Sequence, residues 1–140
     1  ASTKLPSSGK VFLSVRDHDK PRAVEVARGL IAQGFEVCAT GGTATAIADA
    51  GLAVSRENKV QEGRPNIVDS LKNGDIALVI NTTEGRQAIK DSFDIRHEAL
   101  MARMPYFTTI AGAEAAVKAI AAQKADDLHV YSLQECAKAA

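Results

Sequence analysis

The chain has 140 residues, enough for one domain with a single hydrophobic core. Lysine and arginine together number 17, as do aspartate and glutamate, so no basic field points to nucleic acid or to an anionic membrane. Hydrophobic residues make up 46% of the chain, as in ordinary globular proteins, and no apolar run approaches the ~20 residues of a membrane helix. No signal peptide or disulfide framework is indicated, so a domain in the cytoplasm is expected.

The first residues have the composition of a polar linker. The stretch ASTKLPSSG contains serine, proline and glycine, and the chain does not begin with Met. We therefore expect residues 1–9 to be a linker or remnant, and residues 10–140 to form a domain of a longer protein.

Strand-like and helix-like segments alternate from the start of the domain. A strand is predicted over residues 10–15, followed by a helix that Asp19 caps, that Pro21 opens and that Gly34 ends. A second strand over 35–39 leads through a glycine turn into a second helix. The later predicted elements are a strand at 52–54, a loop at 56–66, a helix at 67–72, a strand at 75–81, a helix at 86–104 with a break near residue 93, a strand at 105–107, a helix at 111–123, and a strand at 128–132 before a tail helix.

The alternation of these segments predicts the fold class. The continuous apolar run DIALVIN is typical of a parallel strand covered on both faces. Strands joined by helices build a doubly wound layer fold. We therefore expect an α/β protein, a three-layer α/β/α sandwich with a mainly parallel five-stranded sheet.

The most informative motif is the Thr40-Gly41-Gly42-Thr43 turn between the second strand and the second helix. Glycines allow backbone N–H groups to approach an anion, and the helix start adds the positive end of its dipole. The two threonine hydroxyls add further donors. The turn alone is a weak signal, because many such turns use glycine only for geometry, and it matches neither a Walker sequence nor GxGxxG.

The loops that follow the other predicted strands strengthen the case for an anion site. In parallel sheets these loops meet at one edge, where ligands bind. They carry hydroxyls, amides and cations, a mixture that suits a phosphate joined to a polar sugar or base. The residues are Ser14, Lys20, Thr40, Thr43, Asn58, Lys59, Arg64, Asn81, Thr82, Thr83 and Arg86.

Metal binding and side-chain catalysis receive little support. His18, His97 and His129 have no metal-ligand spacing, and Cys38 ends an apolar strand, where a buried inert thiol is expected. The acidic pair Asp17 and Asp19 could supply a general base, although helix capping explains them more simply. We predict no catalytic residue and no metal site.

Four motifs, in this order, resemble the carboxyl-terminal allosteric domain of the carbamoyl-phosphate synthetase large subunit, bacterial type. They are SVRDHDK at 14–20, ATGGTA at 39–44, ENKVQEGRPNIVDSLKNG at 57–74 and INTTEGRQAIKDS at 80–92. The similarity covers about residues 9–135 and implies a methylglyoxal-synthase-like fold.

The resemblance implies regulation by nucleotides. UMP as inhibitor and IMP as activator would share a site and control carbamoyl phosphate synthesis, from glutamine, bicarbonate and ATP, for pyrimidine and arginine biosynthesis. The domain itself would hold no cofactor, whereas the parent ligase uses ATP, Mg²⁺ or Mn²⁺, and K⁺ in other domains. The implied partners are the rest of the large subunit, the glutaminase small subunit and further copies of the chain.

Motif matching also implies a set of site residues. The effector and phosphate contacts would be Ser14, Lys20, Thr40, Gly41, Gly42, Thr43, Asn58, Lys59, Asn81, Thr82, Thr83 and Arg86, and the surroundings of the base and ribose would be Val60, Ile67, Asp91 and Ile95. The family's Asp-Thr pair on the ornithine side stands here as Phe107-Thr108. The Asp is missing, so only Thr108 carries over.

Two alternatives stay open from the sequence. Methylglyoxal synthase needs an Asp after a Gly-Gly in the third loop, where this chain has Glu62-Gly63-Arg64, and an arginine does not deprotonate a substrate at neutral pH. An enzyme on a small phosphorylated substrate would then have to use Asp17 or Asp19 as its base. The other alternative is a module whose main role is oligomerisation.

Overall fold

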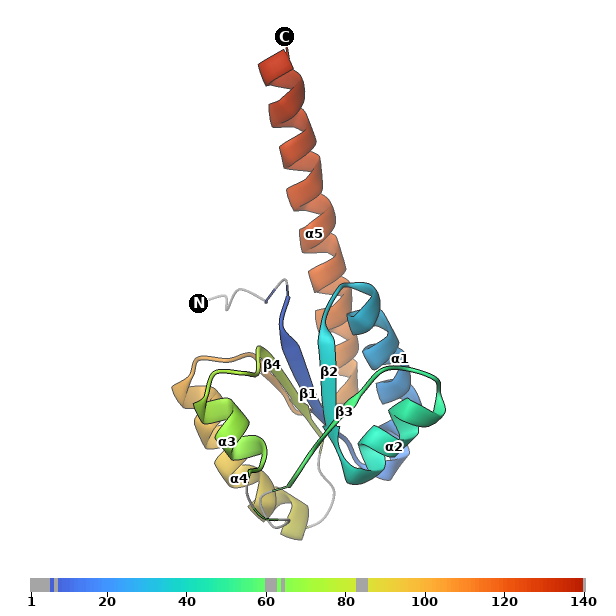
Figure 1. Ribbon diagram of the computed structural model, residues 1–140, viewed down its shortest axis with the longest axis vertical. Helices are drawn as coiled ribbons and strands as arrows, with labels where there is room; N and C mark the ends of the chain where they lie inside the picture. The colour runs from blue at the N-terminus through green and yellow to red at the C-terminus, as the bar shows by residue number, and fades with distance from the viewer. Residues whose placement is uncertain (1–5, 7, 60–62, 64, 83–85, 140) are drawn as a thin grey trace.

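The computed structural model describes residues 6, 8–59, 63, 65–82 and 86–139, with side chains described outside 86–91 and 126–139. Its centre is a five-stranded sheet in which each neighbouring pair is parallel (Figure 1). The strand order is β3-β2-β1-β4-β5, so β1 lies in the middle. The strands are β1 Lys10–Ser14, β2 Glu36–Thr40, β3 Ser55–Glu57, β4 Leu78–Asn81 and β5 Tyr106–Phe107.

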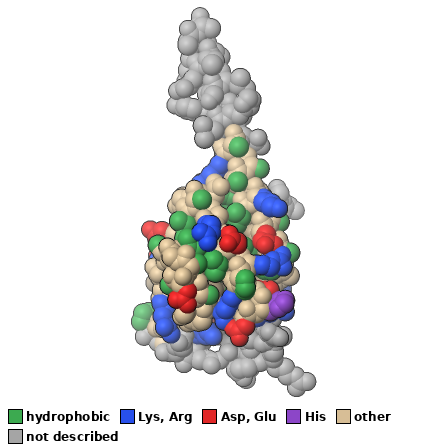
Figure 2. All heavy atoms as spheres, turned by 90° about the vertical axis from the view of Figure 1, so that its right-hand side faces the viewer, with side chains coloured by type: hydrophobic (Ala, Val, Ile, Leu, Met, Phe, Trp, Pro, Cys, Tyr) green, Lys and Arg blue, Asp and Glu red, His purple; other side chains and the backbone are tan. Residues whose placement is uncertain are grey.

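Helices cover both faces of the sheet and complete the predicted three layers. The helices are α1 Lys20–Ala32, α2 Gly41–Asp49, α3 Ile67–Lys72, α4 Arg86–Met101 and α5 Ile110–Ala139, with a 3-10 turn, η1, at Asp17–Asp19. Helices α1, α2 and α5 pack on one face, and α3 and α4 pack on the other (Figure 1). Figure 2 shows the side of α1 and α2, where basic and acidic side chains are interspersed, as the zero net charge leads one to expect.

Alternation along β1 builds the two cores. Val11 and Leu13 are 0% exposed and belong to the cluster beneath α1, α2 and α5. Phe12, also 0% exposed, points to the opposite cluster beneath α3 and α4. Successive strand residues face opposite sides, so a continuous apolar run fills both layers.

The parallel register brings the strand ends to one edge. Ser14 pairs with Asn81 of β4, Leu13 pairs with Ala39 of β2, and Thr40 pairs with Glu57 of β3. The chain leaves β1 toward β2 on one side and has β4 on the other, a switch in strand order at which ligands bind in open α/β sheets. We call this the carboxyl edge.

Two predicted strands are wrong. The third strand is Ser55–Glu57 and not 52–54, because Leu52 and Val54 pack as partly buried side chains against the α1/α2 core, while the polar segment after them pairs with β2 through its backbone. The predicted strand at 128–132 is helical, within α5. No Gly or Pro occurs between Ala113 and the end of the chain, so nothing interrupts the Ala-rich helix.

The other element boundaries differ by a few residues. α4 runs unbroken through Phe93 and ends at Met101, and α2 begins at Gly41, before the predicted start. Helix α3 and the C-terminal glycine of α1 agree with prediction, since Gly34 has φ of +92°. In the part of the chain that the structure describes, no helix combines the length and the hydropathy needed to span a membrane.

Candidate functional site

The predicted glycine turn is the first turn of α2. Thr40 ends β2 with extended dihedral angles (φ −83°, ψ 155°) and stands at the N-cap, and the helix begins at Gly41. Neither Gly41 nor Gly42 has a positive φ. The first N–H groups of a helix lack intrahelical partners and carry partial positive charge. These donors therefore lie at the carboxyl edge.

Lys20 places its ammonium against this turn. Its Nζ lies 2.9 Å from the position that a Cβ of Gly42 would occupy, and its Cε lies 3.3 Å from it. The same ammonium forms an ion pair with Asp17, whose side chain is 92% exposed. The hydrogen bond from Lys20, together with its charge, lowers the pKa of the Asp17 carboxyl. The predicted proximity of Lys20 to the glycine turn is therefore present in the fold.

Arg56 is a cation at this edge that sequence reasoning missed. Its Nη2 lies 3.8 Å from the Cβ position of Gly41. It sits in β3 opposite Ala39, in a segment that was expected to be a loop. If β3 had been recognised as a strand, the alternation of its side chains could have placed Arg56 on the α2 face, opposite to Glu57.

Hydroxyl groups tie the loops of this edge together. Thr40 Oγ1 donates to Ser14 Oγ at 3.0 Å and does not cap α2. The hydroxyl of Thr43, predicted to face the ligand, accepts from the backbone N of Val15 at 3.1 Å and donates to its carbonyl at 3.4 Å. Thr43 is 3% exposed, so this hydroxyl holds the β1 loop against α2.

The polar residues at the end of β4, Asn81 and Thr82, also form hydrogen bonds within the fold. Asn81 Nδ2 donates to the Tyr106 hydroxyl at 2.9 Å, and Thr82 Oγ1 accepts from the backbone N of Arg16 at 3.1 Å. Burial raises the pKa of Tyr106, which the Asn81 hydrogen bond partly opposes. Thr82 also donates its N–H to the Ser14 carbonyl at 2.9 Å. These contacts fix the relative positions of the β1, β4 and β5 ends.

Asn58 organises the loop after β3. Its Nδ2 donates to the Pro65 carbonyl at 3.0 Å, and its own carbonyl accepts from Ile67 N at 3.0 Å. Both contacts join the two ends of the segment that contains Lys59, which is exposed. Asn66 then caps α3 by accepting from Val68 N at 2.9 Å.

The structure describes the side chains of only some of the residues that were predicted to surround the base and ribose. Ile67 and Ile95 are 0% and 7% exposed and lie in the core beneath α3 and α4. For several predicted residues, either the whole residue or its side chain lies outside the part of the chain that the structure describes. These are Val60, Arg64, Thr83, Arg86 and Asp91.

The acidic residues near η1 are engaged in ion pairs. Asp19 is 2% exposed, and its Oδ2 lies 2.8 Å from Arg16 Nε. The prediction that Asp19 caps α1 is wrong for its side chain, because the carboxylate accepts a hydrogen bond from Arg16. Among the residues that the structure describes, no three His, Cys, Asp or Glu side chains gather as a metal site.

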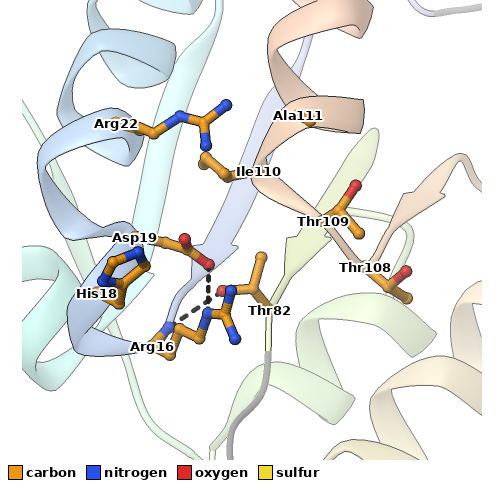
Figure 3. Close-up of a pocket in the computed structure, with 9 residues that line it drawn as sticks. All are labelled: Arg16, His18, Asp19, Arg22, Thr82, Thr108, Thr109, Ile110 and Ala111. Carbon is orange, nitrogen blue, oxygen red and sulfur yellow. Dashed lines mark hydrogen bonds and ion pairs between the residues drawn. The ribbon is translucent and has the colours of Figure 1, made fainter.

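Thr108 lines a pocket of about 330 Å³ between η1 and the start of α5, and Thr82 of the carboxyl edge lines it too (Figure 3). Its two arginines already have carboxylate partners: Arg16 pairs with Asp19, and Arg22 pairs with Glu114. The Thr109 Oγ1 accepts from Gly112 N at 3.0 Å and caps α5. Lys20 and Arg56 lie elsewhere, at the first turn of α2.

Comparison with known proteins relates the chain to one family. A family model described as MGS-like domain matches residues 22–108. The carbamoyl phosphate synthase large chain of Myxococcus xanthus (strain DK1622) is 52% identical over 135 residues, covering 96% of this chain and 12% of the relative. The same protein of Pseudomonas putida (strain KT2440) is 57% identical over 120 residues, covering 86% and 11%. The chain thus spans about an eighth of the length of these curated relatives.

The solved structures agree on the fold. Methylglyoxal synthase from Elizabethkingia anophelis NUHP1 superposes with a TM-score of 0.63 at 21% identity, covering 81% of this chain and 79% of that one. ForH superposes with a TM-score of 0.58 at 18% identity, covering 79% and 76%. The family match, the five-stranded parallel sheet and the high identity to these large chains lead to one conclusion: the chain belongs to the MGS-like domain family and corresponds to the MGS-like domain of carbamoyl phosphate synthase large chains.

Proposed function

We propose that this chain is a regulatory domain that binds the nucleotides UMP and IMP at the carboxyl edge of its sheet. The observation that carries the proposal is the contact of the Lys20 ammonium with the first turn of α2 at Gly42. A helix N-terminus with an adjacent cation is suited to a phosphate group, because backbone N–H groups, the helix dipole and the ammonium all favour negative charge.

The relatives supply the context of this proposal. The chain is more than half identical to segments of proteins named carbamoyl phosphate synthase large chain. In such a protein we infer that the domain controls carbamoyl phosphate synthesis for pyrimidine and arginine biosynthesis, in the cytoplasm. ATP, the divalent metal ion and K⁺ would be used by the rest of the large subunit, together with the glutaminase subunit, and this domain would hold no cofactor.

Regulation requires the nucleotide to distinguish two states of the parent protein. A ligand shifts an equilibrium only by its difference in affinity for the two states, and couplings of about 1–3 kcal/mol are typical. We propose that UMP favours the less active state and IMP the more active one. The loop at 57–66, within which Asn58 donates a hydrogen bond to the Pro65 carbonyl, is the segment that we expect to order or shift when the nucleotide binds.

Calorimetric titration of the 140-residue chain tests the proposal. We expect heat of binding with UMP and with IMP and much weaker binding of uridine and inosine, which lack the phosphate. Lys20→Gln should weaken both nucleotides, whereas Lys118→Gln, an exposed position on α5, should not. Absence of binding by either nucleotide at about 1 mM would contradict the function, and equal binding by Lys20→Gln would contradict the site.

Catalysis by this domain is the alternative that the same titration does not address. Asp17 pairs with Lys20 and Asp19 pairs with Arg16, and neither arrangement leaves a carboxylate poised as a base. We therefore expect no release of methylglyoxal from dihydroxyacetone phosphate. Turnover that Asp19→Asn abolishes would replace the regulatory proposal with an enzymatic one.

A contact role is favoured by one surface feature and is compatible with nucleotide binding. Phe93, Leu100 and Met101 of α4 are 69%, 63% and 71% exposed, and large exposed apolar side chains mark interaction sites. We expect this face to contact other copies of the chain or the rest of the large subunit. Sedimentation of the Leu100→Ser, Met101→Ser variant against the unchanged chain tests self-association.

A further inference from the structure

We propose that Arg56 is a phosphate-binding residue of the effector site and binds the phosphate together with Lys20 at the first turn of α2. The inference rests on the proposed function and adds a residue to it. Arg56 is the penultimate residue of the edge strand β3, and its guanidinium reaches Gly41 across the neighbouring β2 end.

The pleat of β3 determines which face Arg56 reaches. The next residue, Glu57, accepts a hydrogen bond from Ser70 Oγ of α3 at 2.6 Å, so it points to the α3 face. Successive strand residues point to opposite faces, which directs Arg56 to the α2 face. The 3.8 Å separation between Arg56 Nη2 and the Cβ position of Gly41 agrees with this direction.

Two cations therefore lie near one helical turn. Lys20 Nζ lies 2.9 Å from the Cβ position of Gly42, and Arg56 Nη2 lies 3.8 Å from that of Gly41. Their charges and the positive end of the α2 dipole all favour a bound anion at this turn. The carboxylate paired with Lys20 is that of Asp17, which is exposed and can be replaced by a ligand oxygen.

The chemistry of Arg56 fits a phosphomonoester in particular. A terminal phosphate carries a charge of about −1.5 to −2 at pH 7, which two cations match. The guanidinium offers a planar fork that bonds two phosphate oxygens at once, whereas the Lys20 ammonium acts as a point charge. Arg56 should thus contribute to recognition of the phosphate and contribute little to recognition of the nucleoside.

The experiment compares Arg56→Gln and Arg56→Lys with a matched charge control. Arg28→Gln removes the same charge from an exposed α1 arginine that pairs with Glu25 at 3.3 Å. Each chain is titrated with UMP, IMP and uridine, and circular dichroism verifies its fold. Amide spectra follow the Gly41 and Gly42 N–H groups during the UMP titration.

We expect Arg56→Gln to weaken UMP and IMP about ten-fold or more, as for a lost charge-assisted hydrogen bond, and to leave uridine binding unchanged. Arg56→Lys should retain part of the affinity, and Arg28→Gln should match the unchanged chain within about two-fold. The dependence of affinity on salt should also become shallower in Arg56→Gln.

The outcomes separate the two claims. If the unchanged chain binds UMP and IMP, and Arg56→Gln binds them as tightly or loses no more than Arg28→Gln, the role of Arg56 is overturned while the nucleotide site stands. An equal loss of uridine binding would also overturn it, because the effect would not pass through the phosphate. If the unchanged chain binds neither nucleotide, the proposed function fails and this inference fails with it.

Discussion

The Lys20 ammonium occupies the space that a side chain at Gly42 would need, with its Nζ only 2.9 Å from the ideal Cβ position. Gly42 lies inside a regular helical turn without a positive φ, so no backbone requirement explains a glycine there. The close approach of the cation does. The glycine therefore belongs to the geometry of the site.

Gly42→Ala should separate binding from stability. The new Cβ displaces the Lys20 ammonium, so nucleotide affinity falls, while the free energy of unfolding stays level or rises by up to about 1 kcal/mol because Ala favours the helix. Titration calorimetry and urea unfolding measure the two effects. Gly41→Ala is the comparison and should lose less affinity, since its Cβ would meet Arg56 Nη2 at an ordinary 3.8 Å. Equal losses of affinity in both variants would contradict the explanation through Lys20.

Asp17→Asn should strengthen nucleotide binding. The carboxylate competes with a phosphate for the Lys20 ammonium, and it does so while ionised, since its pKa is held below the ordinary value. Exposed ion pairs are weak, so the expected gain in affinity is about two- to five-fold at pH 7. Asp75→Asn, at an exposed position outside the carboxyl edge, controls for net charge. A weaker affinity in Asp17→Asn would show that Asp17 positions Lys20 for the ligand.

Thr43→Val should destabilise the fold. The isosteric change removes the hydroxyl that accepts from the buried Val15 N–H, which is left without that acceptor. The free energy of unfolding should fall by about 1–3 kcal/mol in urea titrations. Thr45→Val, which removes an exposed hydroxyl bonded to the Gly41 carbonyl, should cost clearly less. Similar costs at both positions would mean that the Val15 contact contributes little.

Cys38 should make the protein less stable at alkaline pH. Burial, with a smaller contribution from Glu57, raises the pKa of this thiol to about 12 from an ordinary value of 9.0. Above pH 9 the unfolded chain loses the thiol proton and the folded chain keeps it. Stability present below pH 9 is therefore lost as pH rises toward 12, by about 1.4 kcal/mol per pH unit for this group.

Urea unfolding between pH 8 and pH 10.5 measures this slope. Cys38→Ala, with Cys136→Ser in both chains, removes the titrating group and should flatten the pH dependence. The Tyr106 pKa is also raised, and its contribution is common to both chains. Identical slopes in the two chains would contradict the assignment to Cys38. Cys38 is 1% exposed, so the buried thiol that the sequence predicted is confirmed.

The place of the candidate site could be predicted from the sequence because several of the parallel strands end in polar residues. Ser14, Thr40 and Asn81 follow apolar runs, and the register gathers their ends at one edge. The continuous apolar run at 75–81 likewise predicted a sheet covered on both faces. The contact of Lys20 with the glycine turn follows from the same topology.

What the sequence did not predict depends on partners distant along the chain. β3 has polar side chains and pairs through its backbone, so no hydrophobic pattern marked it and Arg56 was assigned to a loop. The inward hydrogen bonds of Thr43 depend on Val15, which lies 28 residues away. The segment at 128–132 has a strand-like composition, but it continues a helix that began at Ile110.

Helix α5 has a practical consequence for how ligand binding can be measured. It begins just after β5 at the carboxyl edge and runs back past the opposite edge, where β1 also begins (Figure 1). Its 30 residues, at about 1.5 Å each, span roughly 45 Å, whereas a five-residue strand spans about 17 Å. A surface tether or fluorescent label attached after α5 would thus stand well away from Lys20 and Arg56. Immobilised or labelled protein should therefore bind nucleotide as the free protein does.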